Sequence, residues 1–280
     1  MKVIECPRDA MQGLQEFIPT ELKIKYINKL LSIGFDTIDV GSFVSPKAIP
    51  QMKDTADVLE GLDDLGNNKL SVIIANERGV KEATQFSQVT YLGFPLSLSE
   101  TFQQRNTNRS IEDAFEIIKM AQDNCQKSQK ILNVYLSMGF GNPYGDPYSV
   151  DYVTDFSGKL AELGVKIISL SDTIGVASPK IILPVFQRLV QTFPHIEFGA
   201  HLHSTVETVD DKLQAVLESG CRRIDGAIRG FGGCPMAKDD LVGNMPTEKI
   251  IRFLELNNLN TINHEAFQTA FLASNEIFLN

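Results

Sequence analysis

The segment GVKIISLSDT at residues 164–173 shows the pattern that decides the fold of this chain. Gly164 has the backbone freedom that commonly ends a helix, and the apolar residues that follow it predict a short buried strand. The polar pair Asp172-Thr173 comes at the point where that strand ends. Because Gly34 and Gly220 precede two other predicted strands in the same way, the chain repeats one helix–strand unit.

Strands and helices alternate along the whole chain, which is typical of a parallel sheet covered by helices. The eight predicted strands are Lys2–Cys6, Thr37–Gly41, Leu70–Ala75, Gln88–Phe94, Ile131–Met138, Lys166–Leu170, Ile196–His201 and Arg222–Ala227. The hydroxyls of Thr20 and Ser110 are predicted to cap two of the intervening helices.

Eight such units predict an α/β chain with the (β/α)8 TIM-barrel fold, which typically takes about 250 residues. We expect a single catalytic domain over residues 1–280, with the barrel at about 1–256 and an additional C-terminal helical segment at about 264–278. A doubly wound open sheet has the same periodicity and stays an alternative. Its usual signature is missing, because neither Gly-x-Gly-x-x-Gly nor Gly-x-x-x-x-Gly-Lys-Ser/Thr occurs in the chain.

Composition argues against two classes of partner. The chain has 26 Lys and Arg against 35 Asp and Glu, with no basic block to neutralise phosphates, so no nucleic-acid partner is expected. No apolar run approaches the ~20 residues that span a bilayer, so we expect no membrane partner. The four cysteines lack Cys-x-x-Cys spacing and no targeting segment precedes the first predicted strand, which together indicate reduced thiols and a cytoplasmic location.

Polar side chains gather where predicted strands end, which is where barrel enzymes place their active sites. The most informative is His201-Leu202-His203, because alternate residues of a strand face the same side and two imidazoles there can grip a divalent cation. Arg8-Asp9 could equally form a salt bridge on the rim, Asp172 could cap a helix, and Asp39 taken alone favours a structural role. The further positions of this kind are Ser42, Asn76, Thr173 and Arg229–Cys234.

Three loop segments carry further chemistry. The run Gly230-Phe231-Gly232-Gly233-Cys234-Pro235 is too rich in glycine for core packing, so the Cys234 thiol is a candidate reactive group. The run Gly139–Gly145 is either a simple turn or a place where backbone N–H groups approach an anionic substrate. We expect Gln103–Arg109 to be a solvated loop, with contact to the substrate as the alternative.

These motifs, taken in order, resemble the 3-hydroxy-3-methylglutaryl-CoA (HMG-CoA) lyase family of TIM-barrel metallolyases. The resemblance covers essentially the whole chain. It is carried by Pro7-Arg8-Asp9, Ser42–Lys47, Pro50-Gln51-Met52, Asp172–Val176, His201-Leu202-His203, Gly230–Pro235 and Gly243-Asn244.

The resemblance implies cleavage of an acyl-CoA substrate, HMG-CoA, to acetoacetate and acetyl-CoA, with Mg²⁺ or Mn²⁺ as the cofactor. Two imidazoles and two oxygen ligands leave room in an octahedron for a chelating substrate, which suits these ions. The family also implies a homodimer. The positions that match its metal ligands are Asp9, His201, His203 and Asn244.

The resemblance also implies roles in catalysis. Arg8 would balance the negative charge of the enolate, and Ser42 and Thr173 would join it in binding substrate. Asp172 or His201 would take part in proton removal, and Cys234 would deliver the proton to the acetyl-CoA carbanion. The roles of Asp172 and Cys234 could be exchanged.

The chain departs from the family pattern at several positions. Asp39 stands where these lyases usually have Glu, so we expect this shorter side chain to reach a metal only through water, as a member of the layer behind the ligands. Ala10 and Ser171 replace glycines, and Ser204 replaces an aspartate. The interval from Cys234 to Asn244 is one residue longer than usual.

Two alternatives stay open. One is a Claisen-type acyl-CoA condensing enzyme or related aldolase of the same superfamily, although such chains usually continue into extra C-terminal regions. The other is a catalytically silent barrel that binds acyl-CoA or metal. Arg8, Asp9 and Cys234 argue against it, because a mere binder needs no proton donor.

Overall fold

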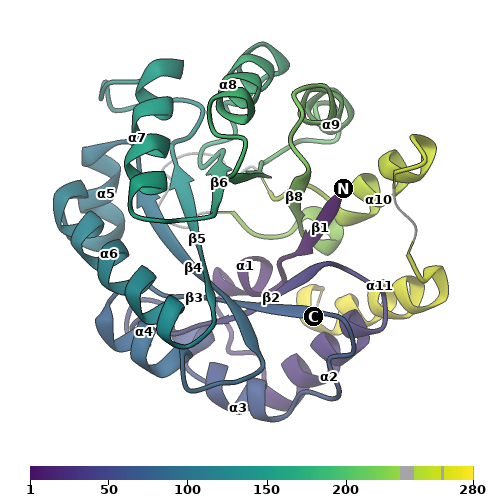
Figure 1. Ribbon diagram of the computed structural model, residues 1–280. Helices are drawn as coiled ribbons and strands as arrows, with labels where there is room; N and C mark the ends of the chain where they lie inside the picture. Colours follow the sequence, from purple (N-terminus) through teal and green to yellow (C-terminus); the bar gives the residue numbers. More distant parts are fainter. Residues whose placement is uncertain (234–242, 260–261, 280) are drawn as a thin grey trace.

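The computed structural model describes residues 1–233, 243–259 and 262–279, and a closed barrel of eight parallel strands lies at its centre (Figure 1). The barrel closes because β1 pairs with β8 as well as with β2. The (β/α)8 prediction is therefore confirmed, and the doubly wound open sheet is excluded. The strands are β1 Lys2–Glu5, β2 Thr37–Ser42, β3 Lys69–Ile73, β4 Val89–Ser97, β5 Ile131–Ser137, β6 Ile167–Ser171, β7 Glu197–His201 and β8 Arg223–Gly226.

Helices surround the strands in Figure 1 and form the outer layer of the molecule. The described helices are α1 Pro7–Gln12, α2 Thr20–Leu31, α3 Thr55–Glu60, α4 Glu77–Ala83, α5 Glu100–Thr107, α6 Ile111–Lys127, α7 Val150–Glu162, α8 Pro179–Thr192, α9 Val209–Glu218, α10 Thr247–Leu256 and α11 His264–Phe278, with 3₁₀ turns η1 Pro50–Met52 and η2 Ile228–Gly230. The predicted C-terminal segment is α11, which packs against α2. None of the described helices is long and apolar enough to cross a membrane.

The strands are buried on both faces, as expected for a parallel barrel. Every residue of β2 and of β6 is buried. β4 continues to Ser97, beyond the predicted end at Phe94, because residues 95–97 still pair with residues 135–137 of β5. Proline lacks an amide donor, yet Pro95 is accommodated within this strand opposite Tyr135.

The signals at helix ends were mostly informative. Ser110 forms the predicted capping box with Asp113, and Gly34, Gly164 and Gly220 have the positive φ angles of 97°, 85° and 86° that helix termination favours. The predicted cap at Thr20 is wrong. This residue is the first of α2, and its hydroxyl donates instead to Asp54 Oδ2 at 2.8 Å.

The solvated loop predicted at Gln103–Arg109 is also wrong. Most of this polar run belongs to α5, which the Ser99 side chain caps by accepting from the Phe102 amide. The helix ends at Asn108, a residue in the left-handed conformation with φ of 54°. The run is polar, so it shows no apolar periodicity from which a helix could be predicted. The helix lies at the mouth of the barrel, where Asn106 and Thr107 line the cavity.

Glu5 ties the first strand to the last part of the barrel. It ends β1 and is completely buried, and its carboxyl oxygens accept from the Ile228 amide at 2.9 Å and the Thr247 hydroxyl at 2.5 Å. Burial raises the pKa of Glu5 to about 8, although both hydrogen bonds oppose that shift. The group is therefore largely a neutral acid near pH 7 and joins β1 to the segments that follow β8.

We predict that Glu5→Gln removes one component of the pH dependence of stability. The folded pKa of about 8 lies above the ordinary 4.5, so proton binding stabilises the wild type fully below 4.5, and this stabilisation is lost as the pH rises through 8. A glutamine amide does not titrate and can keep both contacts, because its oxygen accepts from the Ile228 amide and its NH2 group donates to the Thr247 hydroxyl. Urea unfolding should therefore show that the free energy of unfolding of the variant, relative to that of the wild type, rises by about 1–4 kcal/mol between pH 5 and 9. Parallel stability curves for the two proteins would refute the assignment.

Candidate active site

A cavity of about 330 Å³ opens at the carboxyl end of the strands. Its wall combines apolar residues with a few polar ones, as is usual for a small-molecule site. Residues from the first and seventh βα units meet in it, which is the convergence that the polar positions in the sequence predicted. Its charged and polar wall residues include Arg8, Asp9, Arg109, Thr173, His201 and His203.

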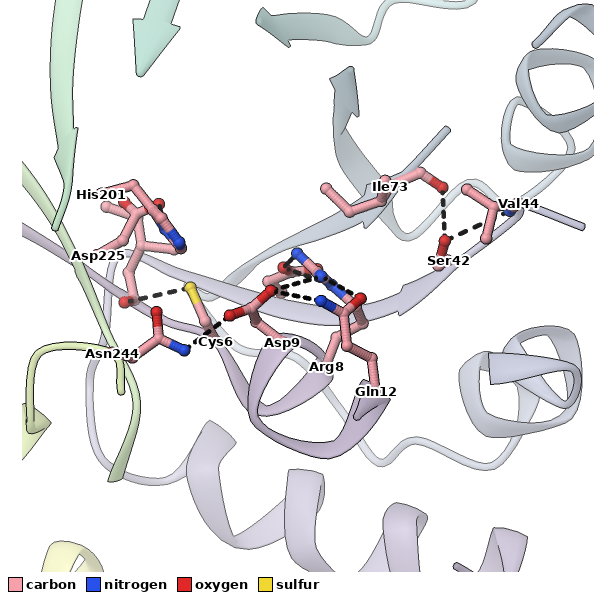
Figure 2. A network of polar contacts seen from close by, with 12 residues as sticks. Cys6, Arg8, Asp9, Gln12, Ser42, Val44, Ile73, His201, Asp225 and Asn244 are labelled. Atoms are coloured by element: carbon pink, nitrogen blue, oxygen red, sulfur yellow. Dashed lines mark hydrogen bonds and ion pairs between the residues drawn. The ribbon is translucent and has the colours of Figure 1, made fainter. Parts of the chain in front are cut away.

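Arg8 lies at the centre of a buried network (Figure 2). Pro7 starts the short helix α1, and its fixed φ suits that position. The Nε and Nη2 atoms of Arg8 donate to Asp39 Oδ2 at 2.9 and 2.6 Å, and Nη1 donates to Asp9 and Gln12 at 2.8 Å each. Burial opposes the charge of Arg8, but Asp39 and Asp9 raise its pKa above the usual value, so the guanidinium stays cationic.

Asp9 joins the two ends of the chain at the site. Its Oδ2 accepts from Asn244 Nδ2 at 2.7 Å, across 235 residues of sequence. Burial disfavours the carboxylate, but Arg8 and the nearby His201 outweigh it and lower the pKa of Asp9 to about 2. Asn244 also donates from Nδ2 to the Phe231 carbonyl at 2.9 Å. Both bonds use the amide nitrogen, which leaves the amide oxygen as the atom suited to a cation.

The two histidines have different surroundings. His201 ends β7, and its Nδ1 lies 3.1 Å from Asp225 Oδ2, which leaves Nε2 for a ligand (Figure 2). Burial opposes protonation of His201, but the Asp225 hydrogen bond raises its pKa. His203 forms an isolated bridge with Asn244, and burial, helped by His201, lowers its pKa to about 4. His203 is therefore a neutral imidazole, the form that binds metals.

These donors fit a divalent cation. Asp9 bonds to Asn244, Asn244 forms the bridge with His203, and the His203 and His201 ring centroids are 5.8 Å apart, so neighbouring residues supply two imidazoles, a carboxylate and an amide oxygen. Asp225 stands behind His201, the arrangement that orients most histidines that bind metals. Cys6, His201 and Asp225 also hold possible ligand atoms within 4.8 Å of one another.

Of the remaining predicted residues, some line the cavity and others do not. Thr173 lines the cavity, and its hydroxyl accepts from the Met138 amide at 2.9 Å. Ser42 is buried, with its hydroxyl 3.4 Å from the Ile73 carbonyl, and the cavity wall uses Val44 and Ser45 instead. Asp39 contacts Arg8, so its link to the cation site runs through that side chain. Cys234 lies outside the described residues.

Asp172 is held from two sides. Its Oδ1 accepts from the Ala177 amide at 2.9 Å, and its Oδ2 forms a buried ion pair with Lys212 at 3.0 Å. Burial raises the pKa of Asp172 despite Lys212. The neighbouring Ser171 and Thr173, but not Asp172, are among the cavity wall residues. The alternative that Asp172 caps a helix is wrong, because Ala177 precedes α8, whose N-cap residue is Ser178.

The loop that leads to Cys234 passes very close to the cation site. Gly232 has φ of 101°, and a Cβ atom there would lie 2.5 Å from Asn244 Nδ2 and 2.9 Å from the Asp9 carbonyl oxygen. Only glycine fits this approach. The run Gly139–Gly145, by contrast, forms a turn and contributes no residue to the cavity wall.

Sequence reasoning missed several residues of the site. Gln12 contacts Arg8 and Asp9, a relation that follows from i, i+3 and i, i+4 spacing once α1 is known to be helical. Asp225 and Lys212 had no local signal, because each depends on a partner from another strand or loop. Arg109 was not missed in the same sense, since contact with substrate was the alternative for its segment, and it lines the cavity from just beyond α5.

The fold and the site together define a TIM-barrel enzyme with a candidate divalent-cation centre. The family model described as HMGL-like matches residues 4–273, and the chain belongs to this family. Among its relatives is the hydroxymethylglutaryl-CoA lyase YngG of Bacillus subtilis (strain 168), which is 34% identical over 255 residues, 91% of this chain and 85% of that protein. The cytoplasmic 3-hydroxy-3-methylglutaryl-CoA lyase of Rattus norvegicus is 31% identical over 93% of this chain and 76% of that protein.

Solved structures agree. The crystal structure of the Bacillus subtilis HMG-CoA lyase has a TM-score of 0.93 and 32% identity, and the match covers 100% of this chain and 94% of that one. An HMG-CoA lyase from Acinetobacter baumannii, in complex with coenzyme A and 3-methylmalate, has a TM-score of 0.91 and 28% identity over 100% of this chain and 91% of that one.

We predict that Arg8→Met destabilises the fold far more than the same change at a surface arginine. Arg8→Met leaves buried Asp9 and Asp39 without their counter-ion, which typically costs about 3–5 kcal/mol. Arg78, whose pair with Glu82 at 3.4 Å is solvent-exposed, is the matched control, and its loss should cost less than about 1 kcal/mol. Urea unfolding compares the variants. Equal losses at the two sites would contradict the central place of Arg8 in the network.

Proposed function

We propose that this chain is a divalent-metal-dependent carbon–carbon lyase that cleaves HMG-CoA to acetoacetate and acetyl-CoA. The observation that carries the proposal is the convergence of Arg8, Asp9, His201 and His203 on one cavity in a chain of the HMGL-like family. The relatives named as HMG-CoA lyases, and the complex of one of them with coenzyme A, support an acyl-CoA substrate.

Asp9, His201, His203 and Asn244 would hold Mg²⁺ or Mn²⁺. When bound, such an ion supplies Lewis acidity that lowers the pKa of a substrate hydroxyl. The choice between the two ions rests on chemistry alone, since both accept mixed oxygen and nitrogen ligands. Asp225 would keep His201 in the tautomer with a free Nε2, and Asp39 would act by holding Arg8.

The proposed reaction is a retro-Claisen cleavage. The C3 hydroxyl loses its proton, the C2–C3 bond breaks to leave the ketone of acetoacetate, and the electron pair moves toward the thioester oxygen. Arg8 is the buried cation beside the cavity that can balance this charge. Thr173 is proposed as a substrate contact, and Ser42 is proposed to act in substrate binding through the Val44 amide, which donates to its hydroxyl. Asp172 or His201 is proposed in proton removal, and Cys234 as the donor of the proton that completes acetyl-CoA.

The direct test measures acetyl-CoA release from HMG-CoA. We expect turnover with added Mg²⁺ or Mn²⁺, its loss after treatment with a chelator, and its return when the ion is restored. Activity indifferent to the chelator would contradict the proposed metal site. A condensing enzyme or a silent acyl-CoA-binding barrel would release no acetyl-CoA at all, so the same assay separates the two alternatives from the lyase.

Arg8→Gln should lower kcat much more than it raises KM. The guanidinium balances charge that exists mainly in the transition state, and loss of such an electrostatic contact typically costs about 10²–10³ in kcat. Steady-state kinetics at a temperature where the variant is folded give both constants. An unchanged kcat would remove Arg8 from the mechanism.

Arg109→Ala should raise KM for the acyl-CoA and leave kcat nearly unchanged. Arg109 lines both the main cavity and an adjoining hollow, so it is placed to contact the phosphates of a CoA substrate at the mouth of the site. Arg105, whose guanidinium stacks on the Tyr144 ring at 4.6 Å and which is outside the cavity wall, is the matched control. We expect a rise in KM of about tenfold for Arg109→Ala, equivalent to ~1.4 kcal/mol, and less than twofold for Arg105→Ala. Equal effects would exclude Arg109 as a phosphate contact.

Two expectations from the sequence stay predictions. A homodimer is the expected assembly, and a cytoplasmic location is the expected compartment. The relatives include lyases described as cytoplasmic and others described as mitochondrial, so the family does not choose between these locations.

A further inference from the structure

A lysine that lies outside the cavity joins two parts of the candidate site. Lys212 belongs to α9, on the outer layer of the barrel, yet only 3% of it is exposed. Its ammonium donates to Asp172 Oδ2 at 3.0 Å and to the His203 carbonyl oxygen at 2.6 Å. A buried ammonium is costly unless it is paired and hydrogen-bonded, and these two acceptors supply both.

The segments that carry these two acceptors are also connected through the backbone. The Asp172 amide donates to the His201 carbonyl at 2.9 Å. Asp172 is therefore tied to His201 by its main chain and, through Lys212, to His203 by its side chain. The result is a closed set of contacts that spans the segment from His201 to His203.

The other side of the His203 segment is held by the strand-like segment around Asn244. The Ser204 amide donates to the Gly243 carbonyl at 3.1 Å, and the Met245 amide donates to the Leu202 carbonyl at 3.2 Å. His203 thus lies between a backbone ladder on one side and the Lys212 ammonium on the other. The Lys212 contact holds the backbone of His203 in place, and therefore the direction in which its ring points.

We propose that Lys212 is a positioning residue of the active site, which holds the His203 backbone and the Asp172 carboxylate so that the two histidines present their rings to one cation. The inference rests on the proposed function for the identity of the cation site. Lys212 itself has no contact with the cavity, so it would act through His203 and Asp172.

The test compares Lys212→Met with a matched control, Lys23→Met. Lys23 is also buried, also pairs with an aspartate, Asp54 at 2.7 Å, and also donates to a backbone carbonyl, that of Gln51. None of these three residues lines the cavity. Both substitutions remove a buried ammonium of the same kind, so both should lower thermal stability. Only Lys212→Met should disturb the candidate site.

The decisive measurement is the Kd for Mn²⁺, obtained by titration calorimetry on the folded proteins. We expect Lys212→Met to raise this Kd about tenfold, as loss of a residue behind a metal ligand typically does, and Lys23→Met to leave it within threefold of the wild type. A change of less than threefold in Lys212→Met overturns the proposal. An equal rise in both variants also overturns it, because the effect would then follow from lost stability.

A double variant provides the test if Lys212→Met does not fold. Lys212→Met strands a buried carboxylate, whereas the double variant Lys212→Met/Asp172→Asn leaves no unpaired charge but still deprives the His203 carbonyl of its donor. The same threefold criterion for Mn²⁺ then applies to the double variant.

A readout without metal separates this inference from the proposed function. If the wild type binds no Mn²⁺, the proposed cation site falls. Hydrogen exchange at the backbone amides of residues 201–205 then decides the inference. We expect faster exchange in Lys212→Met than in the wild type and in Lys23→Met, because the contact that immobilises this segment is lost. Unchanged exchange there overturns the positioning role.

Discussion

The parallel pairing of β1 with β8 is the constraint on which the site depends. Lys2 to Glu5 pair in register with Arg223 to Gly226, and this pairing closes the sheet into a barrel. Only after closure can Asp9, near the start of the chain, accept a hydrogen bond from Asn244 at 2.7 Å. Glu5 strengthens the same seam, because its carboxyl group bonds to residues that follow β8. Fold closure and cation-site assembly are therefore one event.

The charges around the cavity favour the proposed cation. Arg8 faces both Asp9 and Asp39, so these two buried carboxylates share one buried guanidinium, while Asp225 stands behind His201 and close to the buried Arg223. Among the described residues, Asp39 Oδ1 and Asp225 Oδ1 lack hydrogen-bond partners. A buried, unbalanced negative charge is unfavourable, and a divalent ion held by Asp9 would reduce it. The free energy of burying these carboxylates would therefore be lower with a divalent ion bound than in the protein without it.

Local patterns in the sequence predicted the architecture and much of the site. Eight apolar runs with polar ends were sufficient for the barrel, and the His201-Leu202-His203 spacing was sufficient to place two imidazoles on one rim. Lys212 was not predictable, because its position on an amphipathic helix is that of an ordinary surface lysine until the loop with Asp172 packs against it. Asp225 was hidden for a similar reason, since its place in a strand does not show which residue stands opposite.

The C-terminal helix shows how a segment outside the barrel contributes to the site. Arg229 adopts φ of 67°, a left-handed conformation that is unfavourable for a residue with a side chain, by roughly 1 kcal/mol or more. It is held there because its side chain bonds to Ser274 at 2.8 Å and to Asn275 at 2.6 Å, both on α11. Two residues later Phe231 stacks on Phe278 of the same helix, with ring centroids 4.7 Å apart.

This anchoring has a consequence for the cation site. The Phe231 carbonyl accepts from Asn244 Nδ2, the same amide nitrogen that bonds to Asp9. A shift of α11 would therefore move Phe231, change the orientation of the Asn244 amide, and so redirect the oxygen that is suited to a cation. The left-handed turn at Arg229 gains its stability from the helix, and the position of the amide oxygen depends on that turn. The additional helix thus forms part of the support of the active site, although none of its residues lines the cavity.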